Sequence, residues 1–158
     1  MTTSDTFRIE RSIHIDAAPA DITRLIEDFH RWTAWSPWER LDPAMQRSYD
    51  GAERGVGAVY AWTGKKAGAG RMEVKDVRPE RVTIQLDFIR PMKASNTALF
   101  ELAPDGEGTR VTWAMEGRET LLTKLMHAVI NMDKLVGKDF ENGLAELKVQ
   151  AERAAVTA

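Results

Sequence analysis

The sequence predicts an α+β fold in which a curved antiparallel sheet, of about seven strands, wraps around one long C-terminal helix. Hydrophobic and polar residues alternate in a series of short segments, as is typical of half-buried strands, and the turn residues between these segments leave no room for helices. From Glu119 to Ala154 the hydrophobic period changes to that of an amphipathic helix, with a break expected near Asn131–Asp133. Because the sheet and the helix must each bury an apolar side, we expect the sheet to grip the helix.

The first strand is predicted over residues 7–15, where hydrophobic side chains recur on one side. Arg11 falls on that apolar side, either as an inward-pointing charge or as a side chain that extends to the strand edge. If it is buried, it needs a partner, which could be a protein carboxylate or a ligand. Asp16-Ala-Ala-Pro19 ends this strand and begins a short helix, and a second helical piece over Phe29–Leu41 is interrupted at Ser36-Pro37.

Six further strands complete the predicted sheet. They are expected at Met45–Tyr49, Val56–Thr63, Gly68–Val77, Arg81–Ile89, Ser95–Leu102 and Thr109–Glu116. Turn signals such as Asp50-Gly51 separate them, which predicts an antiparallel meander. The connection over residues 87–93 is either a lid that carries Met92 over a cavity, with Arg90 as an anion anchor, or a plain turn between two strands.

Composition limits the class of protein. The chain of 158 residues is predicted to form a single domain, residues 1–158, with residues 1–6 flexible. The net charge of −2 and the interspersed charges predict no nucleic-acid partner. The absence of cysteine excludes a disulfide framework and thiolate chemistry. A polar N-terminus without a signal peptide, and no apolar run of ~20 residues, predict a cytoplasmic protein without stable membrane insertion.

The five tryptophans and seven methionines can form either an ordinary core or the wall of an apolar pocket. Rigid rings and adaptable thioethers suit a pocket that holds a hydrophobic ligand. Strand alternation, helix phase and the possible lid together predict the ligand-binding residues. These are Arg11, Trp35, Tyr60, Trp62, Met72, Phe88, Met92, Phe100, Trp113, Met115, Met126, Val129 and Met132.

Catalytic groups do not converge in the sequence pattern, so the catalytic residues are unknown at this stage. His30, beside the aromatic segment, and Tyr60 are candidates for moving protons. The three histidines lack metal-ligand spacing, so neither a metal site nor a cofactor is predicted. His14 lies on the polar side of its strand and is expected to be solvated. The paired carboxylates Glu39 and Asp42 are predicted to be solvated loop charges.

Four stretches of the sequence are similar to parts of one superfamily. They are Ile13–Pro19 (first strand and helix entry), Asp28–Trp38 (helix-to-strand connection), Gly108–Trp113 (last strand) and Asp139–Lys148 (end of the C-terminal helix). In these stretches the chain resembles the START-like (SRPBCC) superfamily of polyketide cyclase/dehydratase and lipid-transport proteins. The resemblance implies the helix-grip fold over nearly the whole chain. It does not select one activity, because the superfamily includes cyclases, lipid, hormone and quinone binders, and chaperone ATPase activators.

The resemblance leaves three functions to compare. The leading hypothesis is a protein that binds a small hydrophobic or aromatic ligand, such as a lipid, polyketide or quinone, in a cavity between the sheet and the C-terminal helix. The second is an enzyme of the polyketide cyclase/dehydratase type, in which the same cavity would hold a flexible chain near its reactive conformation. The third is an interaction protein, similar to chaperone ATPase activators, that uses the outer face of the sheet. A monomer and a homodimer are both compatible with the sequence.

Overall fold

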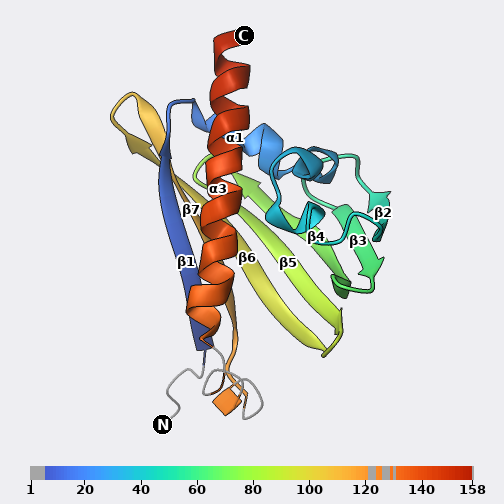
Figure 1. Cartoon of the computed structure of the whole chain (residues 1–158). Helices are drawn as coiled ribbons and strands as arrows, with labels where there is room; N and C mark the ends of the chain where they lie inside the picture. The colour runs from blue at the N-terminus through green and yellow to red at the C-terminus, as the bar shows by residue number, and fades with distance from the viewer. Residues whose placement is uncertain (1–5, 121–123, 126–128, 130, 158) are drawn as a thin grey trace.

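The predicted α+β helix-grip fold is confirmed. The structure, a computed structural model, describes residues 6–120, 124, 125, 129 and 131–157. In this part of the chain, a curved antiparallel sheet of seven strands packs against one long helix, α3 (Met132–Thr157), which crosses its inner face (Figure 1). Figure 1 views the molecule from the side of α3, so the inner, concave face of the sheet lies behind the helix.

The sheet follows the predicted meander, with the first strand added at its far edge. In chain order the strands are β1 (Thr6–Ile15), β2 (Gln46–Gly51), β3 (Ala58–Gly64), β4 (Gly68–Arg78), β5 (Arg81–Arg90), β6 (Ala94–Asp105) and β7 (Gly108–Arg118). Their order across the sheet is β1-β7-β6-β5-β4-β3-β2. Three short helical segments, α1 (Pro19–Ile26), η1 (Phe29–Ala34) and η2 (Pro37–Glu39), lie between β1 and β2. The predicted interruption at Ser36-Pro37 is therefore also present.

The connection between β5 and β6 is a short turn. Strand β5 continues to Arg90 and β6 begins at Ala94, so residues 91–93 alone join them. Phe88 pairs with Ala94 near the end of this hairpin, and the Arg90–Pro91 peptide bond is cis. Of the two alternatives for residues 87–93, the structure matches the plain turn, because most of the proposed lid is strand.

Helix α3 begins at the predicted break. Asn131 is not helical, and its side-chain oxygen accepts a hydrogen bond from the backbone N–H of Lys134 at 3.0 Å. This bond satisfies one of the N–H groups that the first turn of a helix leaves without a partner. Lys124, Leu125 and Val129 are helical, but most of residues 121–130 lie outside the described part of the chain. The predicted helix over Glu119–Ala154 therefore consists of at least two pieces.

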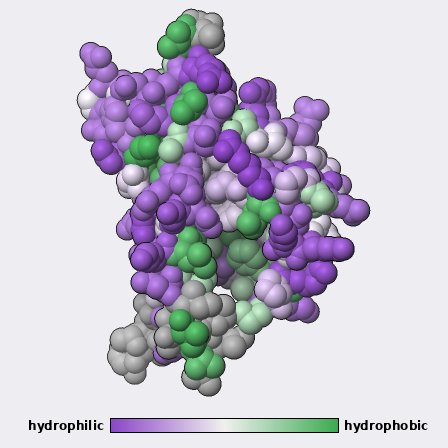
Figure 2. Space-filling view, in the orientation of Figure 1, coloured by the Kyte–Doolittle hydropathy of each residue, from purple (hydrophilic) through white to green (hydrophobic). Residues whose placement is uncertain are grey.

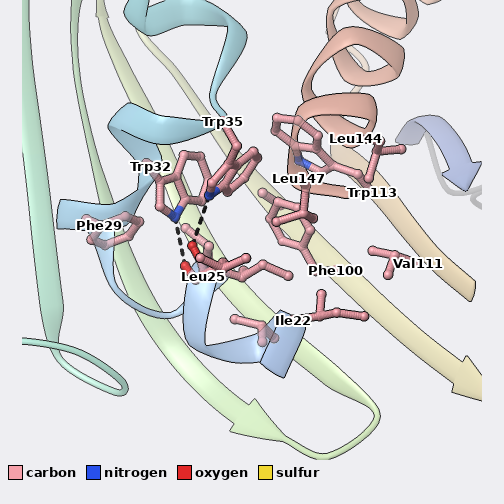
Figure 3. Packing of buried hydrophobic residues seen from close by; sticks show 14 of the residues in the cluster. Ile22, Leu25, Phe29, Trp32, Trp35, Phe100, Val111, Trp113, Leu144 and Leu147 are labelled. Atoms are coloured by element: carbon pink, nitrogen blue, oxygen red, sulfur yellow. Dashed lines mark hydrogen bonds between the residues drawn. The ribbon is translucent and has the colours of Figure 1, made fainter. Parts of the chain in front are cut away.

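One end of the inner face is closed by aromatic side chains (Figure 3). Trp32 and Trp35 donate hydrogen bonds from their indole N–H groups to the carbonyl oxygens of Ile26 and Leu25, at 2.8 and 3.0 Å. Trp113 stacks on Phe140 of α3, with ring centroids 4.2 Å apart. Because the rings are packed and their polar groups are paired, this end of the fold is an ordinary close-packed core.

Candidate functional site

The other end of the inner face is less completely buried. Trp62, Phe88, Met132 and Val136 belong to the layer between the sheet and α3, yet each stays partly exposed to solvent. In contrast, Trp35 and Trp113 at the closed end are only 1% and 2% exposed. Figure 2 shows hydrophobic side chains gathered in a hollow beside the lower half of α3. We call this region, between the first turns of α3 and the inner face of β3–β7, the apolar hollow.

Small residues lie on the inner face of the sheet in this region. Gly70 lies between Trp62 and Phe88 in the register of β3, β4 and β5. A Cβ atom at Gly70 would come within 2.4 Å of the Trp62 ring, so this ring lies directly over the glycine. The Trp62 N–H donates to the carbonyl oxygen of Ala67 at 3.1 Å, which fixes the ring. Ala98 likewise offers only a methyl group on the inner face of β6.

Asn96 is a polar side chain among these apolar neighbours. It lies on the inner side of β6, in line with Ala98 and Phe100, and is 9% exposed. Its amide nitrogen contacts the sulfur of Met115 at 3.9 Å. Its amide oxygen lies against Gly117, where an added Cβ atom would come within 2.1 Å. Asn96 was not among the predicted ligand-binding residues, although the alternation along β6 places it on the inner face.

Tyr60 is buried and hydrogen-bonded within the protein. Its hydroxyl donates to Glu39 at 2.8 Å, and the other carboxylate oxygen of Glu39 accepts from Arg47. Burial and the adjacent Glu39 carboxylate raise the pKa of Tyr60 well above its usual value, so the phenol keeps its proton. As a candidate for moving protons, Tyr60 is thus already bound to a protein acceptor.

The carboxylates of Glu39 and Asp42 correct one expectation. They were predicted to be solvated loop charges, but the Glu39 side chain is 8% exposed and Asp42 is 6% exposed. Asp42 accepts hydrogen bonds from the backbone N–H groups of Lys66 (3.0 Å) and Ala67 (3.2 Å), which lower its pKa. The burial of these two carboxylates could not be predicted locally, because β3 supplies a hydrogen-bond donor to Glu39 and the β3–β4 hairpin supplies the donors to Asp42.

His30 lies at the surface and is held by two neighbours. Its side chain is 54% exposed, and its Nδ1 atom lies 3.0 Å from the Asp28 carboxylate. Its ring stacks on Tyr49 with centroids 4.1 Å apart, and Tyr49 in turn contacts Tyr60 edge-on at 5.3 Å. The structure therefore connects the two candidates for proton transfer, His30 and Tyr60, through the ring of Tyr49.

Arg11 finds its partners on α3. Its guanidinium donates to Glu141 at 2.9 Å and to Asp133 at 3.1 Å, and these carboxylates hold its pKa above the usual value. Gly137 makes this contact possible, since an added Cβ atom would lie within 2.2 Å of the guanidinium. Of the two partners predicted for Arg11, the structure supplies the protein carboxylate.

The other predicted ligand-binding residues lie in different environments. Trp35, Phe100 and Trp113 are in the closed aromatic core, whereas Met72 and Met115 are buried at 7% and 8% exposure. Met92 is half-buried in the β5–β6 turn. Val129 is 79% exposed, contrary to the expectation that it faces inward. The chain is not helical at Asn131 and α3 begins after it, so the phase of α3 does not extend back to Val129. Met126 lies outside the described residues.

Two further features are absent from the part of the chain that the structure describes. Among its residues, no group of three or more histidine, aspartate or glutamate side chains is placed to hold a metal ion. No helix formed by them is long and apolar enough to cross a membrane.

Comparison with known families identifies the relationship of this chain. Residues 6–152 match the family described as polyketide cyclase / dehydrase and lipid transport. The chain belongs to this family. Membership in the polyketide cyclase / dehydrase and lipid transport family supports, in general terms, either binding of a hydrophobic ligand or a cyclase role. No curated protein sequence matches the chain significantly.

Solved structures confirm the fold of this family. The KanY protein has a TM-score of 0.68 at 17% identity, with 93% of this chain and 98% of that chain covered. TTHA0849 from Thermus thermophilus has a TM-score of 0.64 at 19% identity, with 94% and 99% covered. The di-domain ARO/CYC StfQ from the steffimycin biosynthetic pathway has a TM-score of 0.67 at 12% identity, and the match covers 96% of this chain and 52% of StfQ. The TM-scores show a shared fold, and at identities this low they carry no inference about a shared activity.

Proposed function

We propose that this protein binds a small hydrophobic or aromatic molecule in the apolar hollow between α3 and the sheet. The observation that carries the proposal is the incomplete burial of Trp62, Phe88 and Met132, large apolar side chains that face the interior. Apolar surface that remains in contact with water in a concave site favours an apolar ligand. The family, which includes lipid transport, supports the same class of function.

Hydrophobic burial alone predicts a weak affinity. A ligand of two or three fused rings that removes roughly 300 Å² of apolar surface from water gains about 7 kcal/mol before the costs of association. Because those costs are at least about 4 kcal/mol, hydrophobic burial alone gives weak binding, and polar contacts must supply the remainder. These figures leave about 3 kcal/mol, which corresponds to binding in the millimolar range, and micromolar binding, about −8 kcal/mol, would require more buried apolar surface or several net hydrogen bonds.

Binding is favoured over the cyclase alternative by the state of the titratable groups. Tyr60 donates its proton to Glu39, and the raised pKa of Tyr60 keeps the phenol neutral. His30 is half exposed and is held by Asp28 and Tyr49. A general acid or base must reach the substrate proton directly or through one water, and neither of these groups is free beside the described wall of the hollow.

A pair of substitutions in the first turn of α3 tests the proposal. Met132→Glu introduces a charge at the hollow, whereas Leu135→Glu introduces the same charge on a residue that is 56% exposed. Acidic residues are favourable near a helix N-terminus, so both variants should fold. Fluorene, measured by tryptophan fluorescence quenching, should bind Met132→Glu about tenfold more weakly than wild type and Leu135→Glu as wild type. Equal affinity for all three proteins would contradict the proposed location, and no binding to wild type would contradict the function.

A further inference from the structure

The inner face of β6 carries an amide whose hydrogen-bonding capacity is only partly used, two residues along from Ala94, the partner of Phe88 at the apolar hollow. Asn96 carries two N–H donors and a carbonyl acceptor. Among the described residues, its hydrogen bond is the 3.9 Å contact with the Met115 sulfur, and a thioether is a weak acceptor. A side chain that is more than nine-tenths buried with such a partner retains a donor for a stronger acceptor.

The neighbours of Asn96 fix its position. In the register of the sheet, Asn96 lies between Leu86 of β5 and Gly117 of β7. Gly117 has no side chain, which leaves room for the amide oxygen, because a Cβ atom there would overlap it at 2.1 Å. The fold thus places the amide on the inner face of the sheet, two register pairs along from Ala98 and Met115.

The charges near this amide disfavour an anionic ligand. The inward-facing residues beside Asn96 are the apolar Leu86 and Met115. Arg11, on the inner side of β1, is already paired with Asp133 and Glu141. An anion that reached Asn96 from the inner face would lose its hydration beside apolar neighbours, which is costly. A neutral oxygen loses less and can accept a hydrogen bond from the amide.

From these observations we infer that Asn96 determines ligand specificity, selecting a neutral apolar molecule that carries a carbonyl oxygen. This inference rests on the proposed function, since it assigns the polar contact of the same site. The body of the ligand contacts Trp62, Phe88 and Met132, and its oxygen accepts a hydrogen bond from the Asn96 amide.

Three probes of nearly equal shape separate this inference from the proposed function. Fluorene tests apolar binding, fluorenone adds one carbonyl oxygen, and fluorene carboxylate adds a negative charge. Wild-type protein should bind fluorenone roughly three- to tenfold more tightly than fluorene, the effect of one net hydrogen bond. Fluorene carboxylate should bind more weakly than fluorenone. Affinities are measured by tryptophan fluorescence quenching and calorimetry.

Substitution of Asn96 assigns the preference to one residue. Asn96→Leu keeps a similar volume and removes the amide, so the preference for fluorenone should disappear while the affinity for fluorene is retained. Thr97→Val, the next residue on the same strand with its side chain on the opposite face, should retain the full preference. Thermal unfolding checks that both variants fold, and Asn96→Ala repeats the test if Asn96→Leu does not.

The outcomes distinguish the role of Asn96 from ligand binding at the hollow. Equal binding of fluorene and fluorenone to wild type, tighter binding of the carboxylate, or a preference that survives Asn96→Leu would overturn the role of Asn96 and leave the proposed function standing. If none of the three probes binds, the proposed function fails, and the role of Asn96 fails with it.

Discussion

Replacing Tyr60 with phenylalanine tests whether the buried Tyr60–Glu39–Arg47 cluster is structural. Tyr60 is 4% exposed, and its hydroxyl donates to a carboxylate whose side chain is 8% exposed. Without this hydroxyl, one oxygen of the buried Glu39 carboxylate loses its donor. Hydrogen bonds to charged groups contribute about 1.5–3 kcal/mol, so we expect the free energy of unfolding to fall by about 2 kcal/mol.

The assay is thermal and urea unfolding, followed by circular dichroism. For a chain of this length, about 2 kcal/mol corresponds to a fall in melting temperature of roughly 4–8 °C. Tyr49→Phe is the matched control, because it deletes the same hydroxyl from a half-buried ring for which the structure shows no hydrogen bond to a described residue. It should change stability by less than about 0.5 kcal/mol. Equal unfolding of Tyr60→Phe and wild type, or equal loss in both variants, would refute the reasoning.

Three further predictions concern titration and packing. The pKa of both tyrosines is raised, chiefly by burial, so an alkaline titration followed by tyrosinate absorbance should show less ionisation of the folded chain at pH 10 than of the unfolded chain. Equal ionisation of the two states at pH 10 would contradict the burial of these rings. Asp16 and Asp105 raise the pKa of His14, so the stability that His14 contributes should be complete below about pH 6.5 and be lost as the pH rises through the raised pKa. Urea unfolding of wild type and His14→Gln at a series of pH values measures this contribution. Curves of unfolding free energy against pH that run parallel for the two proteins would disprove it. Gly143→Ala should destabilise the fold by about 1–3 kcal/mol despite the better helix propensity of alanine, because the alanine Cβ would lie 2.7 Å from the Trp113 ring. A rise in melting temperature would contradict this prediction and show that the ring can move.

Much of the fold could be predicted because local patterns determine it. Residues 81–89 alternate strictly, and the structure places Val82, Ile84 and Leu86 on the inner face as this pattern requires. Asn131 interrupts the helical period, and α3 begins immediately after it. In these segments the hydrophobic pattern, the turn residues and the final packing agree, so the sequence alone was sufficient.

The candidate site was harder to predict because it depends on contacts between distant segments. Glu39 was expected to be solvated, but Tyr60 and Arg47, from two different strands, bury and bind it. The alternation of β6 could have revealed that Asn96 faces inward, but only the pairing with β7 shows that Gly117 makes room for its amide. The hollow itself results from where α3 crosses the sheet, which no local pattern specifies.

Methyl NMR of methionine offers the most direct test of the central claim, that the apolar hollow binds a hydrophobic ligand. Met132 is partly exposed at the hollow and the Met115 sulfur contacts Asn96, whereas Met45 is in the core at 6% exposure and has no contact with Asn96 among those that the structure shows. With the methionine methyl groups labelled with carbon-13, a titration with fluorenone should shift the signals of Met115 and Met132 saturably and leave Met45 unchanged. Absence of any saturable shift, or shifts that spare Met115 and Met132, would contradict binding at this site.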